Sequence, residues 1–166
     1  ELNASAFSAR VTSSTLSGIY SSVMAAIGTL KGPLHGGANE QVARMLLEIK
    51  SPDRLEAWLE AALASGEKIM GFGHRVYKEG DPRAKILKAM SREITREVGH
   101  PEMYEMSARL EELMGQRKGL ICNVDFYSAS VYHSMGIPID LFTPVFATSR
   151  VAGWCAHVLE QYQNNR

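Results

Sequence analysis

The feature that most constrains the fold of this chain is a helical spacing of apolar residues, interrupted by residues that start and stop helices. Ser51-Pro52-Asp53 is a typical helix start, and Gly66 ends the apolar pattern that follows it. Asp81-Pro82 begins a second such pattern, which Gly99 ends. Runs of strict apolar–polar alternation between hairpin turns, typical of strands, do not occur. The predicted fold class is therefore all-α.

Helices are predicted over most of the chain. Residues 2–30 are rich in small side chains, which favours tightly packed helices, and Gly18 is the expected separator between two of them. In the helix that follows Asp81-Pro82, the stripe expected to be buried is Ile86, Leu87, Met90, Ile94 and Val98. The last helix is expected to be broken or delayed near Pro144. The other predicted helices cover about residues 39–49, 52–65, 101–114, 125–135 and 140–163.

Charge and composition exclude several classes of protein. The 166 residues contain 18 Lys+Arg and 18 Asp+Glu, and this balance argues against a general binder of nucleic acid or anionic membranes. No apolar run approaches the roughly 18 residues of a membrane span. The two cysteines, Cys122 and Cys155, form no C-x-x-C pair, which favours a reducing compartment and a cytoplasmic location. The chain starts without Met, which suggests a processed or shortened chain.

Two glycine-containing runs place a histidine where chemistry is possible. His35 lies in G-P-L-H-G-G-A-N-E, where glycines let the backbone approach a ligand and the following helix is expected to lower the pKa of the imidazole. His74 lies in residues 71–83, and Arg83 in the same run has the planar group that binds carboxylate or phosphate. The alternatives are a structural histidine in a turn and a solvated basic face formed by Arg75, Lys78 and Arg83.

Two further residues could take part in chemistry. Asp125 precedes an apolar helix, where it could be a carboxylate base partly desolvated by Phe126 and Tyr127, or a simple N-cap. Arg150 lies in an otherwise apolar helix and must extend to solvent, form an ion pair or bind an anion. No metal site is expected, because metal-ligand spacing is absent around His100, His133 and His157.

Five runs that follow one another along the chain resemble the citrate synthase family, including its 2-methylcitrate synthase branch. The run at 71–83 is the most specific of them. They are E-L-N-A-S at 1–5, G-P-L-H-G-G-A-N-E at 32–40, G-F-G-H-R-V-Y-K-E-G-D-P-R at 71–83, N-V-D-F at 123–126 and F-A-T-S-R-V-A-G-W at 146–154.

The resemblance implies an enzyme that condenses acetyl-CoA with oxaloacetate and water, giving citrate and CoA. Asp125 matches the general base that removes a methyl proton from acetyl-CoA. His35 matches the residue that hydrogen-bonds the thioester oxygen, and His74 matches the residue that polarises and protonates the oxaloacetate carbonyl. Catalysis of this kind needs the donor, because a thioester methyl is a very weak carbon acid and the developing oxyanion must be stabilised at once.

The resemblance also assigns the binding residues. Arg83 and Arg150 match arginines that hold substrate carboxylates, and Asn3 matches a residue on the oxaloacetate side. Acetyl-CoA is a co-substrate, and no permanently bound cofactor is implied. The segment whose backbone is expected along CoA consists of Lys68, Ile69, Met70, Gly71, Phe72 and Gly73.

Complete members of the family are more than twice as long, which implies that this chain is a part of one. Residues 37–136 match the small domain, and residues 1–36 and 137–166 match pieces of the large domain. A family histidine is expected directly before Glu1 and a further arginine beyond Arg166. The chain alone is therefore expected to be inactive. The complete protein is expected to be a homodimer acting in the tricarboxylic acid cycle.

Three alternatives remain open at this point. A 2-methylcitrate synthase would use propionyl-CoA, and one methylene of pocket volume changes binding by only about 1–3 kcal/mol. A citryl-CoA lyase module would use the same residue types for related chemistry in reverse. A noncatalytic helical module that binds CoA or carboxylates would need the arginines but no base such as Asp125.

Overall fold

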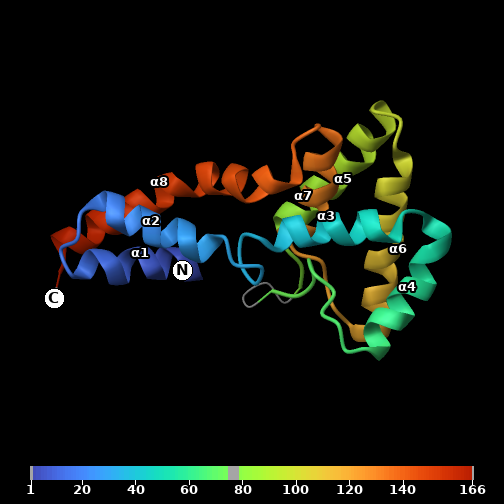
Figure 1. Ribbon diagram of the computed structural model, residues 1–166, viewed down its shortest axis with the longest axis horizontal. Coiled ribbons are helices and arrows are strands. Elements are labelled where there is room, and N and C mark those ends of the chain that lie inside the picture. Colours follow the sequence, from blue (N-terminus) through green and yellow to red (C-terminus); the bar gives the residue numbers. More distant parts are fainter. Residues whose placement is uncertain (1, 75–78, 166) are drawn as a thin grey trace. The chain divides into compact units, whose positions relative to one another are not determined.

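The computed structural model describes residues 2–74 and 79–165 and divides the chain into two compact units (Figure 1). The first unit contains residues 1–37 and 140–166, and the second contains residues 38–139. The all-α class is confirmed, because the described residues form helices and their β pairing is limited to an isolated bridge between Phe72 and Cys122. Arg75 and Lys78, expected to form part of a basic face, lie outside the described residues.

The first unit packs three helices against one another: α1 (Ala4–Ser14), α2 (Ile19–Leu30) and α8 (Phe142–Gln163) (Figure 1). Gly18 is the N-cap of α2 and separates it from α1, as predicted. The inward side chains of α1 are small, so neighbouring helices approach closely. The buried core of this unit is Ala6, Ala9, Ala26, Leu30, Trp154 and Val158.

Pro144 does not break α8. A 3-10 turn at Ile139–Leu141 precedes the helix, which begins at Phe142, so Pro144 is its third residue. At that position the backbone nitrogen has no intrahelical acceptor, and the missing N–H of proline costs no hydrogen bond. Of the two possibilities expected from the sequence, the delayed start is confirmed.

The second unit contains α3 (Ala38–Ile49), α4 (Pro52–Ala64), α5 (Pro82–Glu97), α6 (Pro101–Lys118) and α7 (Val124–Ser134). Helix α7 contacts α3, α5 and α6, while α4 covers α6 and α3. In this central position every residue of α7 is buried or half-buried. The largest fully buried side chains here are Leu46, Ile49, Leu55, Leu59, Met106, Leu110, Met114, Phe126 and Tyr127.

The buried stripe predicted for α5 is only partly correct. Leu87 and Ile94 are half-buried, but Ile86 and Met90 are 65% and 47% exposed, and Ser91 is fully buried. Ser91 Oγ lies 2.7 Å from Ser130 Oγ on α7, so small polar side chains form this contact. Because the two helices pack here through hydroxyls, tertiary packing overrides the local hydrophobic pattern.

A cluster of titratable groups joins three helices inside the second unit. Glu111 on α6 accepts hydrogen bonds from Lys88 Nζ at 2.6 Å, from the Tyr127 hydroxyl and from Cys122 Sγ at 3.2 Å. Burial acts to raise the pKa of Glu111, but these hydrogen bonds and the charge of Lys88 outweigh it and the pKa lies below its ordinary value. Burial and the neighbouring Glu111 raise the pKa of the Cys122 thiol to about 12.

Helix ends follow local chemistry with two adjustments. Ser51 has the extended backbone of an N-cap, yet its side chain makes no capping hydrogen bond. Helix α6 continues past the predicted end to Lys118, where Gly119 takes the left-handed conformation that closes many helices. None of the helices formed by the described residues combines the length and apolar character that a membrane crossing requires.

Candidate functional site

His35 lies in the turn after α2 and is half-buried. The backbone N–H of Ser5 donates to His35 Nε2 at 3.3 Å, and Ser5 Oγ lies 2.9 Å from the same nitrogen. A backbone amide can only donate, so Nε2 is the acceptor. We infer that the neutral imidazole carries its proton on Nδ1, which makes that edge of the ring a hydrogen-bond donor.

Ser5 is the centre of this arrangement, and sequence reasoning did not select it. Its hydroxyl also contacts Asn3 Oδ1 at 2.8 Å and accepts a hydrogen bond from Trp154 Nε1 at 3.1 Å. Both Ser5 and Trp154 are fully buried, which fixes the support of His35. Asn3 Oδ1 also caps α1 by accepting from the backbone N–H of Ala6 at 3.0 Å.

The charge state of His35 follows from its surroundings. Burial lowers the pKa of its imidazole, and the positive charge of Arg150 lowers it further. The ring is therefore neutral at pH 7, as expected. Burial and the charge of Arg150 lower this pKa, whereas the sequence had predicted the lowering from the helix that follows His35. Arg150 itself lies on α8, with its guanidinium carbon 4.9 Å from the ring centre of Phe146.

The two glycines after His35 are required by the end of α2. A Cβ on Gly36 would lie 2.5 Å from Cγ of Leu30, and one on Gly37 would lie 2.7 Å from the carbonyl oxygen of Lys31. Such distances leave no room for a side chain. The glycines therefore allow this turn to fold against its own helix, a reason that adds to the ligand approach predicted from sequence.

In the second unit, residues 71–73 are hydrogen-bonded to residues 121–123 in a short ladder. The N–H of Gly73 donates to the carbonyl of Ile121 at 2.8 Å, and the N–H of Asn123 donates to the carbonyl of Gly71 at 2.9 Å. The rings of Phe72 and Phe126 lie 4.6 Å apart between centroids. This ladder fixes the segment before His74 beside the start of α7.

His74 and Asp125 belong to the two segments that this ladder joins. His74 directly follows Gly73 and is half-buried, and Asp125 lies in the first turn of α7, also half-buried. The N-cap of α7 is Asn123, whose side chain accepts from the backbone N–H of Asp125. The capping role considered for Asp125 is therefore wrong, and the positive end of α7 favours its ionised carboxylate.

Arg83 is oriented by its own helix start. Asp81, the N-cap of α5, is buried and accepts from Arg83 Nε at 2.9 Å and from Nη2 at 2.7 Å. Burial acts to raise the pKa of Asp81, but the hydrogen bonds from Arg83, and a weaker one from the backbone of Val124, outweigh it and lower the pKa. The guanidinium remains partly exposed, in a fixed direction.

The segment predicted to lie along CoA is short and largely buried. Ile69 and Phe72 are core residues, whereas Lys68 is exposed. The ladder uses the carbonyl of Gly71 and the N–H of Gly73. A ligand that lies along this segment would therefore contact atoms that the ladder does not use. The segment consists of Lys68, Ile69, Met70, Gly71, Phe72 and Gly73.

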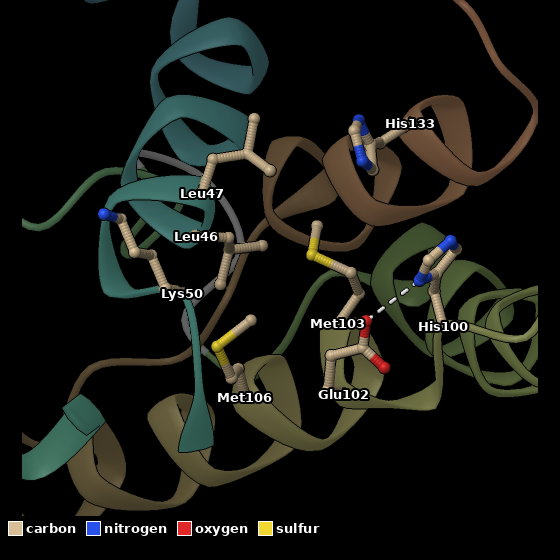
Figure 2. A pocket seen from close by; sticks show the side chains of 8 residues that line it. All are labelled: Leu46, Leu47, Lys50, His100, Glu102, Met103, Met106 and His133. Atoms are coloured by element: carbon tan, nitrogen blue, oxygen red, sulfur yellow. Dashed lines mark hydrogen bonds and ion pairs between the residues drawn. The ribbon is translucent and has the colours of Figure 1, made fainter. Parts of the chain in front are cut away.

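A separate cleft of about 300 Å³ opens elsewhere in the second unit (Figure 2). It lies between the end of α3, the start of α6 and the end of α7, and none of the predicted site residues lines it. At its edge His100 Nδ1 lies within hydrogen-bond distance of Glu102 Oε1, at 3.0 Å. Among the described residues, no group of three or more His, Cys, Asp and Glu side chains could hold a metal ion. The lining residues are Leu46, Leu47, Lys50, His100, Glu102, Met103, Met106 and His133.

The predicted residues divide between the two units. Asn3, His35 and Arg150 belong to the first, and the second contains the CoA segment with His74, Arg83 and Asp125. The charge of Arg150 acts on His35 in the first unit. The second unit carries a base, a histidine and an arginine, residue types suited to proton transfer near carboxylates.

Comparison with known proteins gives a consistent answer. The family model described as "Citrate synthase, C-terminal domain" matches residues 1–166. The chain is 63% identical over 166 residues to "Citrate synthase 2" of Bacillus subtilis (strain 168), covering 100% of the chain and 45% of that protein. It is 50% identical to the "2-methylcitrate synthase" of Shewanella oneidensis (strain ATCC 700550 / JCM 31522 / CIP 106686 / LMG 19005 / NCIMB 14063 / MR-1), covering 100% of the chain and 44% of that protein.

A solved structure agrees with these relatives. The citrate synthase of Thermoplasma acidophilum in ternary complex with carboxymethyl coenzyme A and oxaloacetate superposes with a TM-score of 0.90 and 43% identity. The match covers 98% of this chain and 44% of that one. The chain thus spans less than half the length of each of these three relatives. The family match over residues 1–166 and the helical architecture together establish that this chain belongs to the citrate synthase family.

Proposed function

We propose that this chain is part of a longer protein that condenses acetyl-CoA with oxaloacetate and water to form citrate and CoA. The observation that carries the proposal is the neutral, half-buried His35, whose Nε2 accepts the backbone N–H of Ser5. This arrangement leaves Nδ1–H as a donor for the oxygen of a thioester. One such donor typically raises kcat by a factor of about 10²–10³.

The reaction assigns one step to each polar group. The carboxylate of Asp125 takes a proton from the methyl group of acetyl-CoA, giving an enolate whose oxygen accepts a hydrogen bond from His35 Nδ1–H. The enolate carbon attacks the ketone carbon of oxaloacetate, and His74 gives a proton to the resulting alkoxide. Water then cleaves the citryl thioester, which releases citrate and CoA. These roles rest on family resemblance together with the local geometry of each residue.

Binding groups match the charges of the substrates. Oxaloacetate has two carboxylates, which explains the use of Arg83 and Arg150, with Asn3 on the same substrate. The segment 68–73 would follow CoA. A relative of known structure has been captured with a CoA analogue and oxaloacetate, which supports both substrates.

Substitution of Asp125 tests the enzyme against a noncatalytic binding module. In the complete protein, Asp125→Ala should reduce kcat to near the background rate, because the carbon acid loses its base. Calorimetric binding of oxaloacetate should persist. The result that contradicts the proposal is a folded Asp125→Ala variant with turnover equal to the unmodified protein.

The second candidate is a 2-methylcitrate synthase, favoured by the 50% identity to a protein of that name. Propionyl-CoA differs from acetyl-CoA by one methylene group. An enzyme can discriminate between the two substrates through this group by about 1–3 kcal/mol of activation free energy. The ratio of kcat/KM for acetyl-CoA and propionyl-CoA, measured on the complete protein, decides between them. A ratio above one supports citrate synthase.

We propose that residues 37–136 form the small domain and that residues 1–36 and 137–166 belong to the large domain. The 166-residue chain alone would then be inactive or nearly so. Condensation by the isolated chain at rates near those of the complete protein would contradict this.

Association into a homodimer is proposed from the apolar surface of the first unit. Five large side chains of α1 and α2 are between 46% and 84% exposed and fall on helical stripes, which favours burial by another copy. Sedimentation of a clean monomer at high concentration would argue against the dimer. The exposed residues are Phe7, Val11, Tyr20, Met24 and Ile27. A cytoplasmic enzyme of the tricarboxylic acid cycle is the proposed cellular setting.

A further inference from the structure

The side chain of Asn123 makes two hydrogen bonds in opposite directions. Its Oδ1 accepts from the backbone N–H of Asp125 at 3.0 Å, and its Nδ2 donates to the carbonyl oxygen of Gly73 at 2.9 Å. The partners fix the orientation of the amide, because a backbone N–H can only donate and a carbonyl can only accept.

Both partners belong to peptide groups next to candidate catalytic residues. The carbonyl of Gly73 is part of the peptide bond that leads into His74, and the N–H belongs to Asp125 itself. Gly73 has φ +79°, so the backbone turns sharply just before His74 in a conformation that glycine adopts easily. A hydrogen bond to this carbonyl holds the peptide plane in one orientation.

The ladder between residues 71–73 and 121–123 already aligns the two segments. It does not act on the peptide group that precedes His74. Within the described part of the chain, Asn123 Nδ2 donates to the carbonyl of that peptide group.

We propose that Asn123 is a positioning residue for the condensation, and that its carboxamide sets the orientations of His74 and Asp125 relative to each other. The proposal rests on the proposed function. A displacement of about 1 Å at reacting groups can cost about 100-fold in rate, so a single side chain that fixes two of them affects kcat strongly.

Helix capping alone does not explain the choice of asparagine. Asp, Ser and Thr cap helices about as well as Asn. An aspartate at this position would keep the capping bond but place a carboxylate oxygen against the Gly73 carbonyl. A serine would also keep the cap, but its short side chain could not reach Gly73.

The test compares three variants of the complete protein. Asn123→Asp and Asn123→Ser preserve the cap and remove the bond to Gly73. The matched control is Ser130→Ala on the same helix, which removes a buried hydroxyl bonded to Ser91 and touches neither segment. Thermal unfolding, kcat and both KM values are measured for each.

We expect kcat to fall by about 10- to 100-fold in both Asn123 variants, while the KM for oxaloacetate changes by less than about threefold. Ser130→Ala should lower the melting temperature and leave kcat within about twofold. If the unmodified protein shows no condensation, the proposed function fails. If it is active and a folded Asn123 variant keeps its full kcat, only the positioning role fails. Equal losses of kcat in Ser130→Ala, or failure of both Asn123 variants to fold, would assign Asn123 to stability and overturn the proposal.

Discussion

Alkaline pH should destabilise the second unit through Cys122, and this effect can be isolated. The thiol is buried and donates to Glu111 Oε1 at 3.2 Å. Its pKa is raised from 9.0 in an unfolded chain to about 12 in the folded one, first by burial and then by the charge of Glu111. A raised pKa means that the folded state holds the proton more tightly.

The sign and size of the effect follow from this difference. The stabilising contribution of the protonated thiol is fully present below pH 9 and is lost as the pH rises towards 12. Each pH unit in this window is worth about 1.4 kcal/mol, so about 3 kcal/mol of unfolding free energy should disappear between pH 9 and pH 11.

Urea unfolding at pH 8.5 and 11 of the unmodified protein and Cys122→Ala provides the assay. The variant removes the thiol while Tyr127 and Glu111 remain, so the comparison isolates the thiol together with its interactions with these two groups. The unmodified protein should lose about 3 kcal/mol more than the variant over this interval. Parallel losses in the two proteins would refute the reasoning, as would a thiolate absorbance of the native Cys122 that rises near pH 9.

Three other changes have defined consequences. Gly71→Ala should lower the unfolding free energy by about 2–5 kcal/mol, because Gly71 has φ +85° and a Cβ would lie 2.8 Å from the ring of Phe126; urea unfolding measures this. Ser5→Ala should cost about 1–3 kcal/mol by leaving the buried Trp154 N–H without its partner, and should lower kcat; calorimetry and turnover of one sample check both. Glu111→Gln should weaken the acid sensitivity of stability, because the lowered pKa of Glu111 gives stability that is lost as the pH falls below 4.5; acid titration of unfolding with equal slopes would contradict it.

Much of the fold could be predicted from sequence because helix ends are set by local chemistry. Asp81-Pro82 and Gly99 act within one turn of the ends of α5, so their effect does not depend on distant contacts. The inward face of α5 could not be predicted in this way. Its contact with α7 uses Ser91 against Ser130, two hydroxyls that a hydrophobic pattern assigns to the surface.

The sequence proposes the reactive groups of the candidate site, His35, His74 and Asp125. Their supports lie in the same runs of sequence, but those runs do not show which side chains contact one another. The bond from Trp154 to Ser5 joins residues 149 positions apart, and no local pattern signals it. Asn123 was within reach, since it is a preferred N-cap residue two positions before Asp125. The sequence pattern instead offered Asp125 as the N-cap of this helix, whereas the cap is Asn123.

The two supports work by the same physical principle. Ser5 presents a backbone N–H to His35, and Asn123 joins a backbone carbonyl to the backbone N–H of Asp125. The N–H groups of Ser5 and Asp125 lie in the first turns of α1 and α7, whose backbones hold them, so they do not need to reorganise when charge develops on a substrate. A longer and more mobile supporting side chain would have to be ordered at each turnover. The short polar side chains of Ser5 and Asn123 therefore favour preorganised proton transfer. For this reason conservative substitutions of these two residues should affect kcat more than the free energy of unfolding.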